Sequence, residues 1–380
     1  MKQSVRLGRI DGITVGAHWS VAVILVIITQ VLAVSLLPAA YPHERGALYW
    51  TVAVIAAVLF LASLLAHELA HALVARRCGV KVRSITLWAL GGVTELAGEP
   101  PTAAADFKIA FAGPATSLAC GAIFYGVAAA IHAAGGPAIA VDTAVWLAVE
   151  NGFLAVFNLL PGAPLDGGRV LRAVLWRIHG DREWAERAAG RCGQVLGAII
   201  VALGLTEVLG TRSAGDSVDG LWLMLIGWFL ISAAAAETRA AAARAALAGV
   251  RVADVMTPHP ESAVAWQSVA GFAGVAARSR QDAFPVVGSG GELSGIVLTS
   301  QLARIPPHEQ ARLRLEQVAL AVPPLYRAAP DDPAGPLAGR APLGGEVAAV
   351  VLDHERVTGL VMVSDLEQAL RRRRRTMTRR

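Results

Sequence analysis

A chain of 380 residues that is 55% hydrophobic and only 17% charged is too apolar for an ordinary soluble protein. The composition therefore predicts an integral membrane protein with room for one additional soluble module. The net charge of +5 does not indicate a nucleic-acid-binding protein, because the arginines lie beside apolar segments and in the run Arg371–Arg375. Three cysteines, an odd number without CxxC spacing, argue against a disulfide scaffold.

Six apolar segments are long enough to cross a bilayer as helices, which takes about 20 residues. In chain order they cover about Ser20–Leu37, Tyr49–Arg77, Ala105–Ile131, Ile139–Leu160, Cys192–Leu209 and Gly220–Ala236. Pro38 is expected to end the first of them. Basic residues precede the first span and follow the second, so the positive-inside rule puts both termini in the cytoplasm.

The second span contains the pattern HExxH near its far end, formed by His67, Glu68 and His71. Two histidines four residues apart share one face of a helix, where both imidazoles can bind a single metal ion. Glu68 is suited to take a proton from a water molecule at that metal. Each charged residue in an apolar helix costs about 2.5–3.5 kcal/mol, so the cluster indicates a metal site rather than coincidence.

The segment Ser84–Ala97, between the second and third spans, is too short to cross a membrane as a helix. Its apolar residues flank Gly91 and Gly92, which predicts a short membrane-embedded β-hairpin with a Gly-Gly turn. An exposed strand edge there can pair with an extended substrate peptide. An ordinary interfacial loop is the equal alternative.

The fourth span ends in the sequence NLLPGAPLDGGR, from Asn158 to Arg169. Its prolines and glycines are expected to unwind the helix, and Asp166 lies within this segment. Two histidines, one acid and a water complete the ligand set of a catalytic zinc, so Asp166 is the predicted third ligand; by itself it reads as a turn or capping residue. The arginines that follow, from Arg172 to Arg191, are interpreted as a solvated or headgroup-facing surface.

Beyond an alanine-rich stretch the composition becomes that of a soluble domain, with an internal repeat of strand, turn, strand and helix at 283–302 and 347–366. The predicted organisation is a transmembrane domain at 1–237, a linker at 238–250, the repeat domain at 251–370 with copies at 251–305 and 318–370, and a basic tail at 371–380. The tail is expected to be disordered and to contact anionic lipid.

HELAH within a span, together with NLLPGAPLDGG at the end of a later one, resembles the site-2 protease family of intramembrane zinc metalloproteases, peptidase family M50. The resemblance covers about residues 1–235. It implies one zinc ion per chain, bound by His67, His71 and Asp166, with Glu68 as the general base. It further implies that Asn158 supports the substrate backbone or the oxyanion, and that Gly91 and Gly92 belong to a substrate-binding β segment.

The repeat at 251–370 resembles a pair of cystathionine-β-synthase (CBS) motifs. That family's pattern has Thr three residues and Asp six residues after the glycine of the second strand, where they bind the ribose and phosphate of an adenine nucleotide. Here Leu298 and Met362 replace both threonines and Gln301 replaces the first Asp, while Asp365 matches. Nucleotide binding and a structural or sensing role therefore both stay open, as does a homodimer formed through the CBS pair.

The fold class predicted is a multi-pass α-helical membrane protein of about six spans with a short embedded β segment, followed by a C-terminal α/β CBS-pair domain. The predicted function is hydrolysis of peptide bonds in or near the transmembrane segments of single-span membrane proteins, such as an anti-sigma or signalling factor, with the CBS pair regulating it from the cytoplasm. The alternatives are a CBS-regulated transporter or channel and a non-catalytic pseudo-protease. Few intramembrane charges lie outside the two motifs, which argues against a pore.

Overall fold

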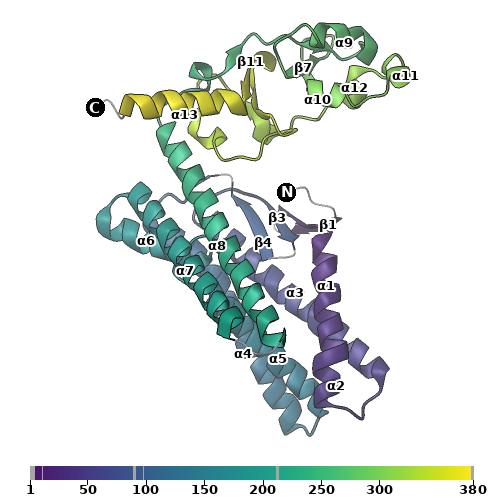
Figure 1. Ribbon diagram of the computed structural model, residues 1–380, viewed down its shortest axis with the longest axis vertical. Helices are drawn as coiled ribbons and strands as arrows, with labels where there is room; N and C mark the ends of the chain where they lie inside the picture. Colours follow the sequence, from purple (N-terminus) through teal and green to yellow (C-terminus); the bar gives the residue numbers. More distant parts are fainter. Residues whose placement is uncertain (1–4, 11, 89–90, 97, 211–213, 378–380) are drawn as a thin grey trace. The chain divides into compact units, whose positions relative to one another are not determined.

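The computed structural model describes residues 5–10, 12–88, 91–96, 98–210 and 214–377, and Figure 1 traces the chain through them. The chain divides into two compact units, Met1–Glu237 and Thr238–Arg380. The first unit consists of long apolar helices with one small sheet, and the second is a smaller α/β unit.

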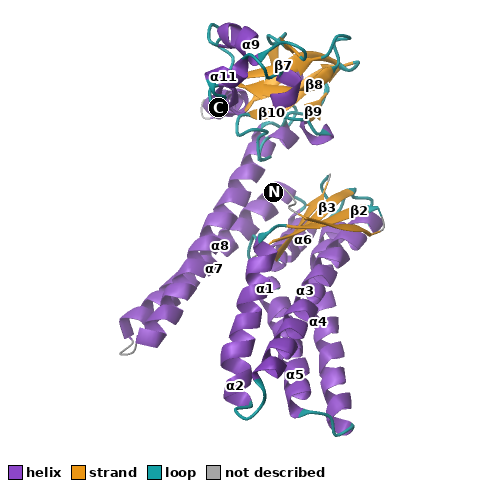
Figure 2. Cartoon of the chain, turned by 90° about the vertical axis from the view of Figure 1, so that its right-hand side faces the viewer, coloured by secondary structure: helices purple, strands orange, loops and turns teal. Residues whose placement is uncertain are grey.

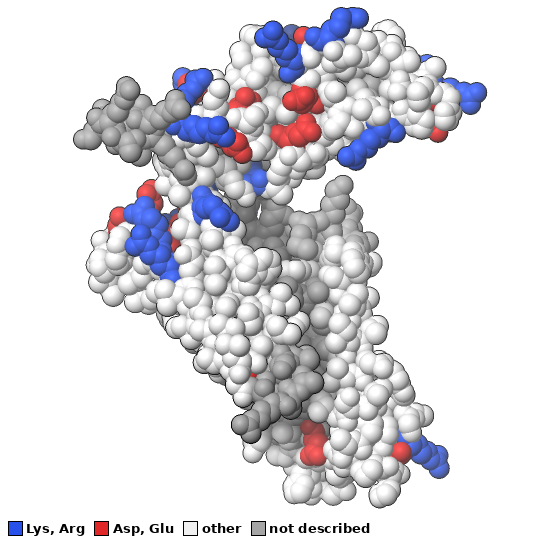
Figure 3. Space-filling model, viewed as in Figure 1, with Lys and Arg blue, Asp and Glu red and all other residues white. Residues whose placement is uncertain are grey.

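Six helices among the described residues are long and apolar enough to cross a membrane, which confirms the predicted number of spans. The helices of the first unit are α1 (Ser20–Val31), which continues through a π-helical turn at Leu32–Leu36 into α2 (Leu37–Ala40), α3 (Gly46–Arg77), α4 (Ala103–Ala133), α5 (Ala138–Asn158), the shorter α6 (Asp166–His179), α7 (Arg182–Gly210) and α8 (Ala214–Ala246). On the face drawn in Figure 3, charged side chains of this unit gather near its two ends. The apolar middle of the helices is the part that matches a hydrocarbon layer.

Pro38 does not end the first span, so that prediction is wrong. The helix continues to Ala40, with Pro38 in the first turn of α2. The N–H of Leu37 donates to the carbonyl of Leu32, a π-type bond that spans five residues. This wider turn immediately before Pro38 relieves the clash and the lost hydrogen bond that a proline causes inside a regular α-helix.

A four-stranded sheet with the order β1-β2-β3-β4 lies at one end of helices α1 and α3 (Figure 2). Its strands are β1 (Val5–Ile10), β2 (Ile13–Ala17), β3 (Val82–Trp88) and β4 (Gly91–Leu96). The predicted hairpin of β3 and β4 is present, but Trp88 pairs with Gly91, so Gly91 and Gly92 begin a strand instead of forming the turn. Residues 89 and 90, which connect the two strands, lie outside the described residues.

The sheet is attached to the helix that carries HExxH. Ile13 and Val15 of β2 and Ile85 of β3 are buried in one cluster with Ala72 of α3. Strand β2 pairs in parallel with β3, so residues near the N-terminus contribute to this layer. The sheet, and β4 with it, is therefore positioned by apolar packing against α3 one residue beyond His71.

The second unit contains the predicted repeat twice. The first copy has β6 (Ala263–Val264), α9 (Val269–Ala276), β7 (Ala283–Val287), β8 (Leu293–Leu298) and α10 (Thr299–Leu302), followed by α11 (Pro307–Gln310) and α12 (Leu315–Val318). The second has β9 (Arg327–Ala328), β10 (Val347–Asp353), β11 (Arg356–Met362) and α13 (Val363–Met377). The sheets have the orders β6-β7-β8 and β5-β11-β10-β9, with β5 at Thr257–Pro258. This is the mixed α/β architecture expected for a CBS pair.

The predicted linker and the predicted basic tail are both largely helical in the described residues. Helix α8 continues to Ala246, so much of the predicted linker at 238–250 is helix. Helix α13 includes the run Arg371–Arg375 and ends at Met377, so the prediction of a disordered tail is wrong for 371–377. Leu366, Ala369 and Leu370 anchor α13 on the apolar core of the second unit, and arginine is a good helix former that lets the helix continue.

Candidate active site

The structure brings together the three side chains that the sequence predicts as metal ligands, although Asp166 lies about a hundred residues beyond the histidines. Nε2 of His67 and Nε2 of His71 are 3.1 Å apart. Oδ2 of Asp166 lies 3.2 Å from the first and 3.1 Å from the second. Both histidines are buried, and no other group of three His, Cys, Asp or Glu ligand atoms meets in the described part of the chain.

Helix α4 orients both histidines. Nδ1 of His71 lies 2.6 Å from the carbonyl oxygen of Ile109, and because a carbonyl can only accept, this nitrogen carries the proton. Nδ1 of His67 lies 2.8 Å from Oγ of Ser117, which can accept in the same way. With the Nδ1 atoms occupied, the Nε2 atoms remain available as ligands. Sequence reasoning missed Ser117, which gives no local signal.

Gly113 of α4 provides the space in which the two imidazoles meet. A β-carbon at this position would lie 2.2 Å from Nε2 of His71 and 2.4 Å from Nε2 of His67. Any side chain here would occupy the place where the ligand atoms converge. The absence of a side chain at Gly113 is therefore what makes room for the ligand cluster.

Glu68, between the two histidines, is in contact with strand β4. Its Oε2 accepts a hydrogen bond from Oγ1 of Thr94 at 3.0 Å. A β-carbon on Gly92 would lie 2.2 Å from Cγ of Glu68, so only glycine lets the strand pass this close to the carboxylate. Gly91, with φ of 136°, has a backbone conformation that favours glycine. Thr94 was not identified from the sequence, because its role depends on how β4 lies over α3.

Asp166 is the first residue of α6, directly after the loop that follows α5. Gly167 and Gly168 let that loop fold back onto the helix start, because a β-carbon on either would come within 2.3 Å of the loop backbone. The N-terminus of α6 favours the ionised form of the Asp166 carboxylate.

Asn158, the remaining predicted residue of the site, is the last residue of α5. Its Nδ2 donates to the carbonyl oxygen of Leu154 in the same helix at 2.9 Å. This hydrogen bond satisfies the amide within α5 and does not connect it to the ligand cluster. Its role toward a substrate stays a prediction.

The residues present fit a catalytic zinc. Ligands about 2.0–2.1 Å from a tetrahedral zinc are about 3.3–3.4 Å apart, close to the separations among the two imidazoles and the carboxylate. Three protein ligands of this kind, with a fourth position left for water or substrate, are the set found in catalytic zinc sites. Structural zinc sites instead use four protein ligands.

A metal centre of this composition beside a buried glutamate, within a bundle of membrane-spanning helices, defines an intramembrane metalloprotease. Sequence comparison gives the family: the chain belongs to peptidase family M50, whose family model matches residues 55–135 and 130–203. This membership favours the protease over the transporter and pseudo-protease alternatives. The protein is an intramembrane zinc metalloprotease.

Related proteins support this membership over nearly the whole chain. Rip3 of Mycobacterium tuberculosis (strain H37Rv), whose name assigns it as a zinc metalloprotease, is 44% identical over 372 residues, covering 97% of this chain and 93% of Rip3. The similarly named sll0528 of Synechocystis is 31% identical, over 84% of this chain and 82% of that protein. The solved structure of the site-2 protease from Methanocaldococcus jannaschii is 27% identical, with a TM-score of 0.42, and matches 62% of this chain and 95% of its own.

Proposed function

We propose that His67, His71 and Asp166 bind the catalytic zinc and that Glu68 is the general base that activates water for peptide-bond hydrolysis. The observation that supports this most directly is the arrangement around Glu68. It follows the first histidine on α3, adjoins the ligand cluster, and lies against the backbone of β4 at Gly92. Base, metal ligands and a strand that can bind a peptide thus meet at one point.

In the proposed mechanism, Glu68 accepts a proton from the attacking water and later passes it to the leaving amine. The hydrogen bond from Thr94 holds Oε2 of the carboxylate and so fixes its orientation for this proton transfer. Zinc, when bound, supplies the Lewis acidity that makes water nucleophilic at neutral pH and polarises the scissile carbonyl. We assign Asn158, at the end of α5, to hydrogen bonding with the substrate backbone or the oxyanion.

We propose that the substrate binds as an extended strand along β4. Strand β4 is the last strand of the order β1-β2-β3-β4, so its outer edge has no partner strand among the described residues. A peptide added to this edge pairs through its backbone and runs past Glu68 at Gly92. A transmembrane helix keeps its amides in internal hydrogen bonds, so the substrate must unwind before it can bind in this way.

We assign the substrates to single-span membrane proteins, of which an anti-sigma or signalling factor is an example. The end of α3 that carries His67 and His71 has Arg76 and Arg77 in its last turn, and Lys81 follows shortly after the helix. By the positive-inside rule this end faces the cytoplasm, and so do both termini and the CBS pair. Cleavage is then expected at the cytoplasmic side of the substrate's span.

The test uses the full chain reconstituted with a single-span reporter. Glu68→Gln should abolish cleavage while retaining zinc, because it removes the base and leaves the ligands. Asp166→Asn should lower both. Glu44→Gln, in the exposed loop between α2 and α3, is the matched control and should leave cleavage unchanged. Undiminished cleavage by Glu68→Gln or Asp166→Asn would overturn the mechanism.

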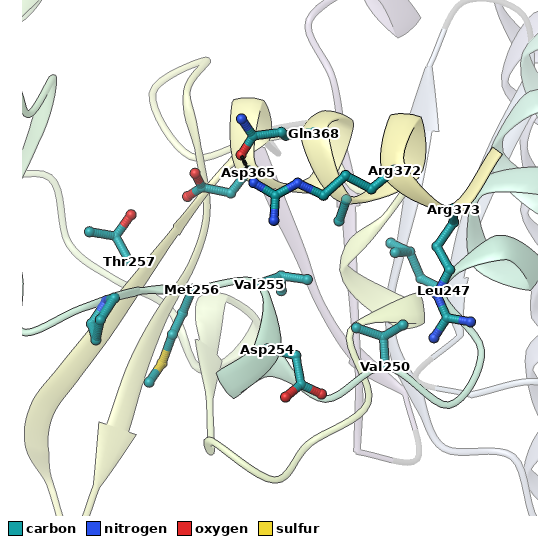
Figure 4. A pocket seen from close by; sticks show the side chains of 12 residues that line it. Leu247, Val250, Asp254, Val255, Met256, Thr257, Asp365, Gln368, Arg372 and Arg373 are labelled. Atoms are coloured by element: carbon teal, nitrogen blue, oxygen red, sulfur yellow. Dashed lines mark hydrogen bonds between the residues drawn. The ribbon is translucent and has the colours of Figure 1, made fainter. Parts of the chain in front are cut away.

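A second proposal concerns the CBS pair, which we assign to regulation of the protease by an adenine nucleotide. A cavity of about 780 Å³ is lined by residues of the second unit, including Asp365 and Arg372 of α13 and Thr257 of β5. In Figure 4 Asp365, Gln368 and Arg372 all come from α13. A carboxylate for ribose hydroxyls and a guanidinium for phosphate are complementary to a nucleotide.

Calorimetric titration of the full chain with ATP and with AMP tests this assignment. Binding that Arg372→Gln weakens would support it, and the absence of heat with both nucleotides would contradict it. Arg312→Gln, which lies outside the cavity lining, is the control. Sedimentation with and without nucleotide tests the homodimer that we propose to form through the CBS pair.

A further inference from the structure

One face of helix α4 carries three residues that adjoin the two histidines of the ligand cluster. Ile109, Gly113 and Ser117 lie four residues apart and serve the two histidines, as described above. Asp106 lies three residues before Ile109, so it continues the same stripe of the helix. It is fully buried, and its carboxylate binds Arg172 of α6, the helix whose first residue is Asp166.

The contact between Asp106 and Arg172 is a bidentate ion pair. Nε of Arg172 donates to Oδ2 of Asp106 and Nη2 donates to Oδ1, both at 2.8 Å. Arg172 is only 8% exposed, so the prediction of a solvated surface is wrong for this arginine, although Arg177, Arg187 and Arg191 are exposed as expected. Glu186 of α7 lies 3.7 Å from Nη1 of Arg172, and Arg169 lies 3.7 Å from Asp106, so the buried pair is the centre of a small network with two partly buried charges.

Such a pair is not explained by stability alone. Removing two charges from water costs free energy that the attraction between them often fails to recover, and well-packed apolar residues do as well or better. What a two-pronged guanidinium–carboxylate contact adds is a defined geometry, because both hydrogen bonds form at only one relative orientation of the groups. The geometry that this pair defines is that of α6 relative to α4.

The position of α6 in turn sets the position of Asp166. Arg172 lies six residues after Asp166, about 9 Å along the helix axis and about 240° around it. A rotation or slide of α6 that opens the contact between Arg172 and Asp106 therefore also moves the carboxylate of Asp166. The loop before Asp166 cannot fix the position of this carboxylate independently of α6, because the loop is itself packed on Gly167 and Gly168 of α6.

We propose that Asp106 and Arg172 are positioning residues for the third zinc ligand: their ion pair locks α6 onto α4 so that Asp166 meets His67 and His71. This inference rests on the proposed zinc site. Helix α4 then aligns all three ligands, the histidines through direct contacts and the aspartate through Arg172. The pair touches neither substrate nor metal, so it acts on the reaction only through Asp166.

The experiment measures zinc affinity of the purified full chain by competition with a chromophoric chelator, together with the visible spectrum of the Co²⁺-substituted protein. Asp106→Asn should weaken zinc binding by about 10- to 100-fold, the usual effect of removing a group that orients a ligand. Arg172→Lys keeps the charge but loses the two-pronged contact, so its affinity should fall by about 10-fold. Both should alter the Co²⁺ spectrum, which reports ligand geometry.

Arg177→Gln, an exposed position on the same helix as Arg172, is the control, and its zinc affinity and Co²⁺ spectrum should match those of the unmodified chain.

The unfolding temperature of the metal-free protein separates positioning from general stability. Folded variants that unfold at a lower temperature yet bind zinc with unchanged affinity and an unchanged Co²⁺ spectrum would overturn the proposal. If Asp106→Asn does not fold, Arg172→Lys, which keeps the charge, decides by the same two readouts. An unmodified chain without zinc affinity would overturn both this proposal and the zinc site. A different result would be an unmodified chain that binds zinc without cleaving any reporter, together with variants that bind zinc more weakly. That result would support the positioning role and would count only against the proposed protease mechanism.

Discussion

The backbone of Gly92 lies directly on the side chain of Glu68, so closely that a β-carbon on the glycine would come within 2.2 Å of Cγ of the glutamate. The two residues belong to different elements, β4 and α3, and are held together by the packing of the sheet on α3. Thr94, two residues further along β4, adds a hydrogen bond to the same carboxylate. The strand proposed to bind the substrate therefore also positions the proposed general base.

Replacing Gly92 by alanine should displace either β4 or Glu68. Misplacing a catalytic group by about 1 Å can cost about 100-fold in rate, so cleavage should fall by about that factor. Zinc content should stay unchanged because none of the three ligands is touched. Gly98→Ala is the matched control, since a β-carbon there meets no atom within 4 Å. Reporter cleavage and metal analysis of both variants check this, and an active Gly92→Ala enzyme would show that the close contact is dispensable.

Thr94→Val removes the hydroxyl group that donates to Glu68 while keeping the shape of the side chain. Without this hydrogen bond the carboxylate is free to rotate, and we expect the turnover number to fall by about 10-fold, which is less than the roughly 100- to 10,000-fold that a positioned acid or base itself contributes. Thr94→Ser should retain most of the activity because it keeps the hydroxyl. Steady-state kinetics on a reporter measure the effect, and equal rates for the Val and Ser variants would contradict it.

Gly113→Ala should abolish zinc binding rather than merely slow the reaction. Its β-carbon would enter the space where the Nε2 atoms of His67 and His71 meet. The imidazoles cannot easily move away, because their Nδ1 atoms contact Ser117 and Ile109 of α4. Gly126→Ala, on the same helix, places a β-carbon where no atom lies within 4 Å and should keep full zinc content. Metal analysis of the two purified proteins compares them, and stoichiometric zinc in Gly113→Ala would refute the predicted steric conflict.

Ser117→Ala tests the orientation of His67 separately from its ability to bind metal. Losing the hydroxyl that faces Nδ1 should weaken zinc binding by about 10- to 100-fold while leaving the protein folded. The neighbouring Thr116 bonds to the carbonyl of Ala112 within its own helix, so Thr116→Ala is a close control. Chelator competition measures both affinities, and a Ser117→Ala protein as tight as the Thr116→Ala protein would rule out the orienting role.

Removing the metal should inactivate and destabilise the enzyme together. Ligand at 100 times its dissociation constant stabilises the folded state by about 2.7 kcal/mol, so restoring zinc to the chelated protein should raise its unfolding temperature and recover cleavage. The Asp166→Asn protein should show little of either response. Differential scanning fluorimetry and reporter cleavage, followed in parallel, provide the measurement.

Several features of the fold follow from local sequence alone. The spans are read from runs of apolar residues, because a bilayer of known thickness requires helices of known length. His67 and His71 share a helix face by their spacing, whatever the rest of the fold does. The sequence also predicts the CBS-like repeat, because both copies have the same order of strand, turn, strand and helix.

Other features depend on contacts between distant residues. Strand β2 was not predicted, because its pairing joins Thr14 to Ser84, far along the chain. The burial of Arg172 was missed for the same reason, since its partner Asp106 lies in another helix. Pro38 was misread because the π-helical turn that accommodates it is not encoded by a recognisable pattern.

By itself, the sequence determined which residues can bind the metal and accept the proton, since ligand chemistry and helical spacing are local properties. Only the tertiary structure decided how those residues are aligned. It placed β4 over Glu68, Ser117 behind His67, and Arg172 between α6 and α4. These relationships arise from the packing of helices and strands against one another, which depends on the shapes of many side chains at once.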